Sequence, residues 1–132
     1  MRFVPPRVHG VLDYLFAGLF IVAPFWFGFV SRVAQLSSFA FGGAILLLSL
    51  LTRYPLGVLR VIPFPVHGGI ELVSSVALIA LPWLGRFGDT PVARNFFVAT
   101  GVILFGLWLT TDYKAAEQDQ AGAWRRGLHG RA

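Results

Sequence analysis

Cysteine is absent from the 132-residue sequence, and charged residues are scarce. Without cysteine there is no disulfide framework, no thiolate nucleophile and no Cys-ligated zinc or iron–sulfur site. Charged residues make up 13% of the chain, about half the roughly 25% that is typical of soluble domains. Hydrophobic residues make up 56%, and the mean hydropathy is +0.71. This composition indicates a membrane protein, and the length suits one domain of modest size.

The chain also lacks the patterns of a nucleic-acid-binding protein or an enzyme. Its formal net charge is +5, but the basic residues are scattered between apolar runs rather than gathered on one surface. That distribution is typical of charges that set membrane topology, so we expect no nucleic-acid partner. No phosphate loop, dinucleotide fingerprint or nucleophile motif is present. We therefore predict no enzymatic activity, no cofactor and no resident metal.

Four apolar runs are long enough to cross a bilayer, and they cover approximately residues 8–30, 36–52, 66–84 and 92–111. The first run is too long for the core of a usual signal peptide and recurs in mid-chain, so we expect a retained span. The sequence thus predicts an all-α, polytopic membrane protein with four transmembrane helices. We expect one membrane domain over residues 1–132, ending in a polar, basic tail at 113–132.

An internal repeat organises these runs. Residues 8–13, VHGVLD, return 58 residues later as 66–71, VHGGIE, and each following run ends in proline and an aromatic residue, at Pro24 and Pro82. With the same offset of 58 and no gap, Gly43 in the second run would match Gly101 in the fourth.

Repeat one then covers about 2–54 and repeat two about 60–112. Two tandem helix hairpins enter the membrane in the same direction, so an axis along the membrane normal should relate them.

The distribution of basic residues predicts the orientation. Arg2, Arg7, Arg53, Arg60, Lys114, Arg125, Arg126 and Arg131 would share one side, and Arg32, Arg86 and Arg94 the other. Because eight basic residues lie on the side of the termini and three on the other, the positive-inside rule places both termini in the cytoplasm.

A histidine and an acid at the start of the first helix, then proline and an aromatic residue at its end, occur twice in tandem. This pattern resembles the SPW-repeat integral membrane proteins of bacteria, which are named after a Ser-Pro-Trp motif. The matching positions read Pro24-Phe25-Trp26 and Pro82-Trp83, without the serine. The resemblance covers about residues 5–112 and implies a four-helix fold in the bacterial cytoplasmic (inner) membrane. The family carries no established activity. We expect structural roles for the repeated motif residues Gly10, Pro24, Trp26, Gly68, Pro82 and Trp83.

The histidine and the acid of each repeat carry the chemistry. His9 and Asp13, like His67 and Glu71, are four residues apart and would share one helix face. Parallel repeats would place both pairs at one depth, where the four side chains could converge.

Three interpretations follow. The favoured one is a polar helix entrance in a non-enzymatic membrane module. The alternatives are a proton-linked or small-solute transporter or channel, and a metal- or haem-binding redox partner. Besides the lipid bilayer, a homo-oligomer or an unidentified membrane partner is plausible.

Overall fold

The computed structural model describes residues 2–114, 118, 122 and 125–127. Its four helices are α1 (Pro6–Trp26), α2 (Arg32–Leu51), α3 (Phe64–Leu84) and α4 (Pro91–Thr110). Each has 20 or 21 residues, about 30 Å of helix, which matches the hydrocarbon core of a bilayer. All four are apolar enough to cross a membrane, so the predicted all-α fold with four candidate spans is confirmed. Most of the predicted basic tail, Arg131 included, lies outside the described residues.

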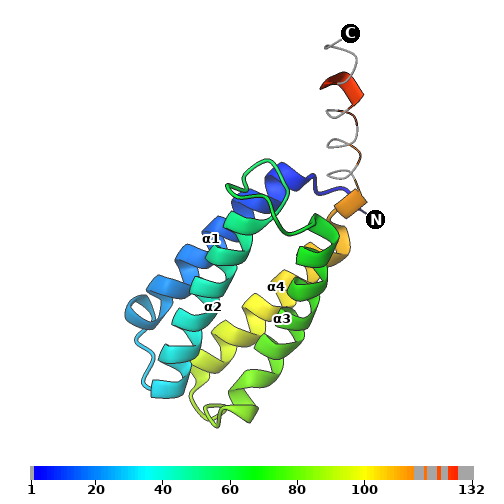
Figure 1. The fold of residues 1–132 in the computed structure, drawn as a ribbon. Coiled ribbons are helices and arrows are strands. Elements are labelled where there is room, and N and C mark those ends of the chain that lie inside the picture. The colour runs from blue at the N-terminus through cyan, green and yellow to red at the C-terminus, as the bar shows by residue number, and fades with distance from the viewer. Residues whose placement is uncertain (1, 115–117, 119–121, 123–124, 128–132) are drawn as a thin grey trace.

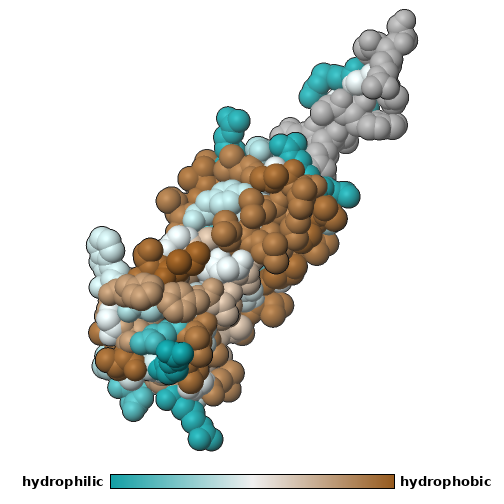
Figure 2. All heavy atoms as spheres, turned by 60° about the vertical axis from the view of Figure 1, so that its left-hand side comes forward, coloured by the Kyte–Doolittle hydropathy of each residue, from teal (hydrophilic) through white to brown (hydrophobic). Residues whose placement is uncertain are grey.

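The helices form two antiparallel pairs, with α1 packed against α2 and α3 packed against α4 (Figure 1). The two short turns lie at one end of the bundle. The chain's N-terminal segment and the connection between α2 and α3 lie at the other end. Apolar side chains cover much of the face shown in Figure 2, and Leu15 and Val73 are more than 60% exposed. In this multi-pass membrane protein, that surface is the one that lipid covers.

Two predicted helix boundaries were wrong, both at the first turn. α1 ends at Trp26 rather than near residue 30, and Gly28, with a φ of +64°, turns the chain. α2 begins at Arg32 rather than near residue 36, because the Ser31 side chain caps it by accepting a hydrogen bond from the Ala34 amide at 3.3 Å.

The prolines near the ends of α1 and α3 shape the turns. Pro24 and Pro82 are both buried. Their carbonyls accept the amides of Phe29 at 3.0 Å and Phe87 at 2.7 Å. The two prolines therefore have the same local role in both repeats, at the exit from a span rather than at a hinge in its middle.

The constant offset of 58 holds for the first helix of each repeat and is wrong for the second. A Cβ added to Gly42 would lie 2.8 Å from Ile21 Cγ1, and one added to Gly101 would lie 2.7 Å from Ile79 Cγ1, whereas Gly43 faces open space. Gly42 and Gly101 are therefore equivalent, at an offset of 59. The first turn spans 27–31 and the second spans 85–90, one residue longer.

The end of each hairpin pairs with the segment that precedes the other hairpin. Thr52 forms a parallel bridge with Ile62, just before α3, and Thr111 forms the matching bridge with Val4, just before α1. Each repeat therefore closes onto the start of the other.

An aromatic core fills the half of the bundle that holds the turns. It comprises Phe20, Phe29, Phe41, Phe87, Phe96 and Phe97, which are packed with Leu78. Phe20 lies 11 residues after His9, about 16 Å further along α1. The aromatic core thus occupies a different layer from the histidines.

Candidate functional site

The four ionisable residues singled out from the sequence converge in one buried cluster between the repeats. His9 Nε2 lies 3.3 Å from Asp13 Oδ1 and 3.2 Å from Glu71 Oε2. His67 Nε2 lies 3.1 Å from Asp13 Oδ2. None of the four residues is more than 4% exposed. We call these four residues the His–acid cluster. Each repeat supplies one imidazole and one carboxylate, and two of the three contacts cross between repeats.

A threonine from the end of the neighbouring hairpin holds each imidazole. His9 Nδ1 is 2.7 Å from Thr111 Oγ1, and His67 Nδ1 is 2.7 Å from Thr52 Oγ1. Both hydroxyls donate their single proton to a backbone carbonyl one turn earlier in their own helix. Each hydroxyl must therefore accept from the imidazole, which assigns the N–H to Nδ1. In both rings the nitrogen that faces the carboxylates is Nε2.

A tyrosine just after α2 or α4 donates to each carboxylate. The Tyr54 hydroxyl donates to Asp13 Oδ2 at 3.3 Å, and the Tyr113 hydroxyl donates to Glu71 Oε2 at 2.7 Å. Burial raises the pKa of both phenols, and the adjacent carboxylate raises it further. Both tyrosines therefore remain protonated donors near neutral pH.

The glycine that follows each histidine makes room for that tyrosine. A Cβ on Gly10 would lie 2.8 Å from the Tyr54 ring, and one on Gly68 would lie 2.7 Å from the Tyr113 ring. In each repeat, the histidine therefore belongs to the cluster, and the glycine after it has no side chain and so leaves space for the tyrosine ring.

Two polar atoms of the cluster lack a hydrogen-bond partner among the described residues. His9 Nε2 lies between two carboxylates without a hydrogen bond to either, and Glu71 Oε1 is likewise unpartnered. Buried polar atoms in native proteins are seldom left unpaired. The unpaired atoms therefore indicate that the cluster has capacity for a further ligand.

The sequence interpretation missed the two threonines and the two tyrosines. Their signal is a Thr-x-Tyr pattern, at 52–54 and again at 111–113, which is visible only with the offset of 59. Trp26 and Trp83, by contrast, lie far from the cluster near the turns and are 81% and 59% exposed. Such exposed tryptophans at helix ends are typical of a membrane interface rather than of a buried site.

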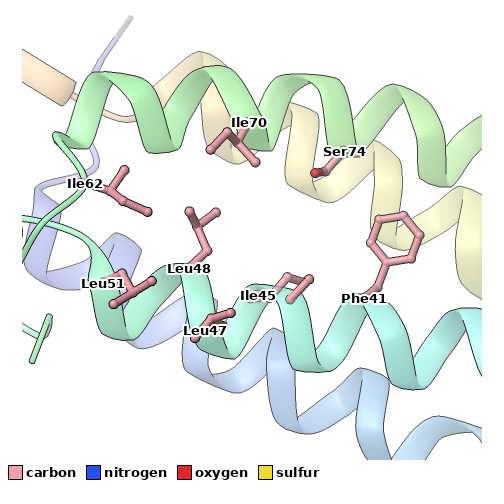
Figure 3. Close-up of a pocket in the computed structure, with 9 residues that line it drawn as sticks. Phe41, Ile45, Leu47, Leu48, Leu51, Ile62, Ile70 and Ser74 are labelled. Carbon is pink, nitrogen blue, oxygen red and sulfur yellow. The ribbon is translucent and has the colours of Figure 1, made fainter. Parts of the chain in front are cut away.

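An apolar groove of about 300 Å³ lies between α2 and α3 (Figure 3), and it is separate from the cluster. Its only polar side chain is that of Ser74. The matching residue in repeat one is Phe16, which packs against the core, so the groove occurs where a phenylalanine is missing. Its lining residues are Phe41, Ala44, Ile45, Leu47, Leu48, Leu51, Ile62, Ile70 and Ser74.

Comparison with known protein families identifies the family of this chain. The model of the SPW repeat domain matches residues 7–111, which include both hairpins and the whole His–acid cluster. The chain belongs to the SPW repeat family. No curated protein and no solved structure matches it. In this SPW repeat protein, serine is missing from both copies of the motif, while the proline and the turn it shapes are kept.

Proposed function

We propose that the protein is a non-enzymatic membrane module that binds a cationic species between its two repeats and does not conduct it across the bilayer. The observation that carries this proposal is the His–acid cluster. Both repeats contribute equally to it, and the neighbouring helix ends hold every one of its side chains.

The electrostatics of a buried cluster favour a bound cation. Two buried carboxylates carry two negative charges that lipid and apolar side chains cannot solvate. With both carboxylates ionised, neutrality requires two positive charges beside Asp13 and Glu71, carried either by protons on the imidazoles or by a bound cation. The tyrosines stabilise the carboxylates by hydrogen bonds but add no charge.

The aromatic core argues against conduction. A route from the cluster to the far turns would have to pass Phe20 and Phe97, which are at most 1% exposed. The nearest buried polar side chain beyond Glu71 on α3 is that of Ser75. Its hydroxyl donates a hydrogen bond to the Leu72 carbonyl at 2.7 Å. The buried hydroxyls of Ser38 and Thr100 likewise donate to backbone carbonyls. The described residues therefore form no continuous chain of ionisable groups of the kind that marks an ion or proton path.

The surroundings of the cluster also argue against catalysis. Its side chains are closed to a substrate by burial. The buried hydroxyl of Ser38 donates to the Phe20 carbonyl rather than to a histidine. The hydroxyls of Thr52 and Thr111 lie within reach of a histidine, but each donates its proton to a backbone carbonyl and accepts from the imidazole. Neither hydroxyl is therefore activated as a nucleophile, as covalent catalysis requires.

For the orientation, we infer that the cluster end faces the cytoplasm of a bacterial cell. That end carries the N-terminal segment and the connection between α2 and α3 (Figure 1). The basic residues assigned to this side outnumber those at the turns, as the positive-inside rule requires. The absence of cysteine permits a clean test: an impermeant maleimide should label Arg60→Cys only from the cytoplasmic side and Asp89→Cys only from the opposite side.

Cation binding is tested by thermal unfolding of the purified protein in lipid nanodiscs, with a panel of Na⁺, K⁺, Mg²⁺, Ca²⁺, Mn²⁺ and Zn²⁺ chlorides. A ligand that binds only the folded state raises the Tm. We expect at least one cation to raise the Tm of the wild type and not that of the double variant Asp13→Asn/Glu71→Gln, which lacks the two negative charges. If no cation distinguishes the two proteins, the proposal is wrong.

Conduction is tested in proteoliposomes that hold a pH-sensitive dye or a fluorescent cation indicator. We expect the flux to equal that of protein-free vesicles. A flux that the wild type supports and that His67→Ala/Glu71→Gln abolishes would establish transport instead.

A further inference from the structure

We infer that the His–acid cluster is a binding site for one divalent transition-metal ion of the zinc class, ligated by His9 Nε2, His67 Nε2 and the carboxylates of Asp13 and Glu71. This inference rests on the proposed cation binding and names the ligand of that site.

The spacing of the ligand atoms fits a metal centre. One ligand atom from each of His9, His67 and Glu71 lies within 4.8 Å of the other two. Zinc bonds to imidazole and carboxylate are about 2.0–2.2 Å long, so the edges of a tetrahedral site measure roughly 3.3–3.6 Å. The three distances from Nε2 to a carboxylate oxygen are 3.1–3.3 Å, close to this range. Asp13 contacts the two imidazoles with different oxygens, so its carboxylate would turn and the side chains would draw together around an ion.

The imidazoles are already prepared as ligands. Metal-binding histidines donate their second ring N–H to an outer partner, which fixes the tautomer and the ring orientation. Thr111 and Thr52 are such partners for His9 and His67, since both hydroxyls accept from Nδ1 at 2.7 Å. With Nδ1 protonated, each Nε2 faces the carboxylates. A metal ion between them would take the place of the imidazolium protons and bind Nε2 and the carboxylate oxygens together.

The unpaired atoms give independent support. His9 Nε2 and Glu71 Oε1 are buried and have no hydrogen-bond partner among the described residues. Both belong to the proposed ligand set, so a metal ion would satisfy them together.

The donor set selects the class of metal. Two imidazoles with two carboxylates suit zinc, manganese, iron(II) or cobalt(II), whereas calcium and magnesium prefer oxygen ligands alone. One divalent ion also neutralises two carboxylates without a net charge. Haem does not fit, because the His9 and His67 ring centroids are 5.4 Å apart and the Phe64 ring packs against both, which leaves no slot for a porphyrin.

The experiment begins with purified full-length protein that has been treated with a chelator and loaded with zinc chloride alone. We expect one zinc per chain by elemental analysis. Affinity is measured by competition with a chromophoric chelator. Cobalt(II) in place of zinc should give the intense visible bands of four-coordinate cobalt. This readout uses the wild type only, so it does not depend on whether any variant folds.

Variants separate ligands from positioning residues. His9→Gln and His67→Gln should abolish stoichiometric binding, while His129→Ala, the third histidine of the sequence, is the matched control and should bind as the wild type does. Thr52→Val and Thr111→Val should keep one zinc per chain with about 10–100-fold weaker affinity. Thr52→Ser keeps the hydroxyl and should restore the affinity, which a purely structural role of this residue would not predict.

The outcomes are decisive in both directions. Failure of the wild type to bind zinc, or equal binding by the double variant His9→Gln/His67→Gln, overturns the metal site. If another cation still raises the Tm of the wild type and not that of Asp13→Asn/Glu71→Gln, only the choice of metal fails. If no cation does so, the proposed function fails as well.

Discussion

The two repeats resemble each other more closely at the cluster end of the bundle than at the turn end. At the cluster end, the contacts that hold the imidazoles are repeated: His9 with Thr111 matches His67 with Thr52, at the same 2.7 Å. The tyrosines and glycines follow the same rule. The ion pairs are less regular, because His9 contacts both carboxylates and His67 contacts Asp13.

At the turn end, the prolines are repeated, but several buried equivalent positions hold different residues. Phe20 of repeat one corresponds to Leu78, and Ser38 corresponds to Phe97. All four are buried. The comparison shows that equivalence persists where each buried polar atom needs a specific partner, and is lost where the packing needs only the right total volume.

The largest expected effect comes from breaking the symmetric end. Asp13→Ala removes the carboxylate that contacts both imidazoles and Tyr54, and should lower the free energy of unfolding by about 3–5 kcal/mol, because it leaves buried charge uncompensated. Unfolding followed by circular dichroism in micelles measures the loss. The control Asp89→Ala, at an exposed position in a turn, should change stability by no more than about 0.5 kcal/mol. Similar losses for both variants would show that the cluster contributes no special stability.

The next test examines the register of the repeat. Gly42→Ala and Gly101→Ala place a Cβ against a neighbouring helix, and each should cost about 1–3 kcal/mol through overpacking. Gly43→Ala meets open space and should be neutral or slightly stabilising, because alanine favours helix. The same unfolding assay compares the three. If Gly43 rather than Gly42 proves sensitive, the offset of 59 is wrong.

A smaller effect should appear at the asymmetric end. Phe20→Leu alone leaves a cavity, and Leu78→Phe alone overpacks the aromatic core to which both residues belong. The double variant restores the total volume, so its loss should be smaller than the sum of the single losses by at least about 0.5 kcal/mol. A double-mutant cycle measures this coupling. Strict additivity would mean that the two positions do not share one packing space.

The smallest effect concerns alkaline pH. The raised pKa values of Tyr54 and Tyr113 mean that folding holds their protons more tightly than the unfolded chain does. This stability is fully present below the ordinary tyrosine pKa of about 10 and is lost as the pH rises above it. Ultraviolet absorbance should therefore show both phenols ionising only as the helices unfold. Ionisation near pH 10 with intact helices would contradict their burial against the carboxylates.

The sequence was sufficient to predict the fold, because the lengths of the apolar runs and a twofold repeat leave few ways to arrange four spans. The predicted offset was wrong in the second helices for an identifiable reason. Gly42 is followed by Gly43, and Thr110 by Thr111, so both offsets align identical residues there. The close contact between helices distinguishes them, and Tyr54 and Tyr113, which are 59 residues apart, agree with it.

The candidate site was predicted in part. The spacing of His9 and Asp13 placed both side chains on one face of a helix, but convergence with the second pair depends on how the repeats face each other. The roles of Thr52 and Tyr54 depend on the backbone after α2, where a bridge to Ile62 holds the chain. No local pattern encodes that long-range pairing.

The reciprocal pairing of the chain ends has a consequence for connectivity. The amide of Val4 donates to the Thr110 carbonyl at 2.9 Å, and the amide of Asp112 donates to the Val4 carbonyl at 3.1 Å. The beginning of the first hairpin therefore lies beside the end of the second. The end of the first hairpin lies beside the beginning of the second in the same way, and there the chain itself connects them. A circular permutant, opened between Val58 and Leu59 and joined by a linker from a residue after Tyr113 to Val4, would preserve the cluster and the Tyr113 hydrogen bond to Glu71. Equally, two separate copies of one such hairpin could build it as a dimer.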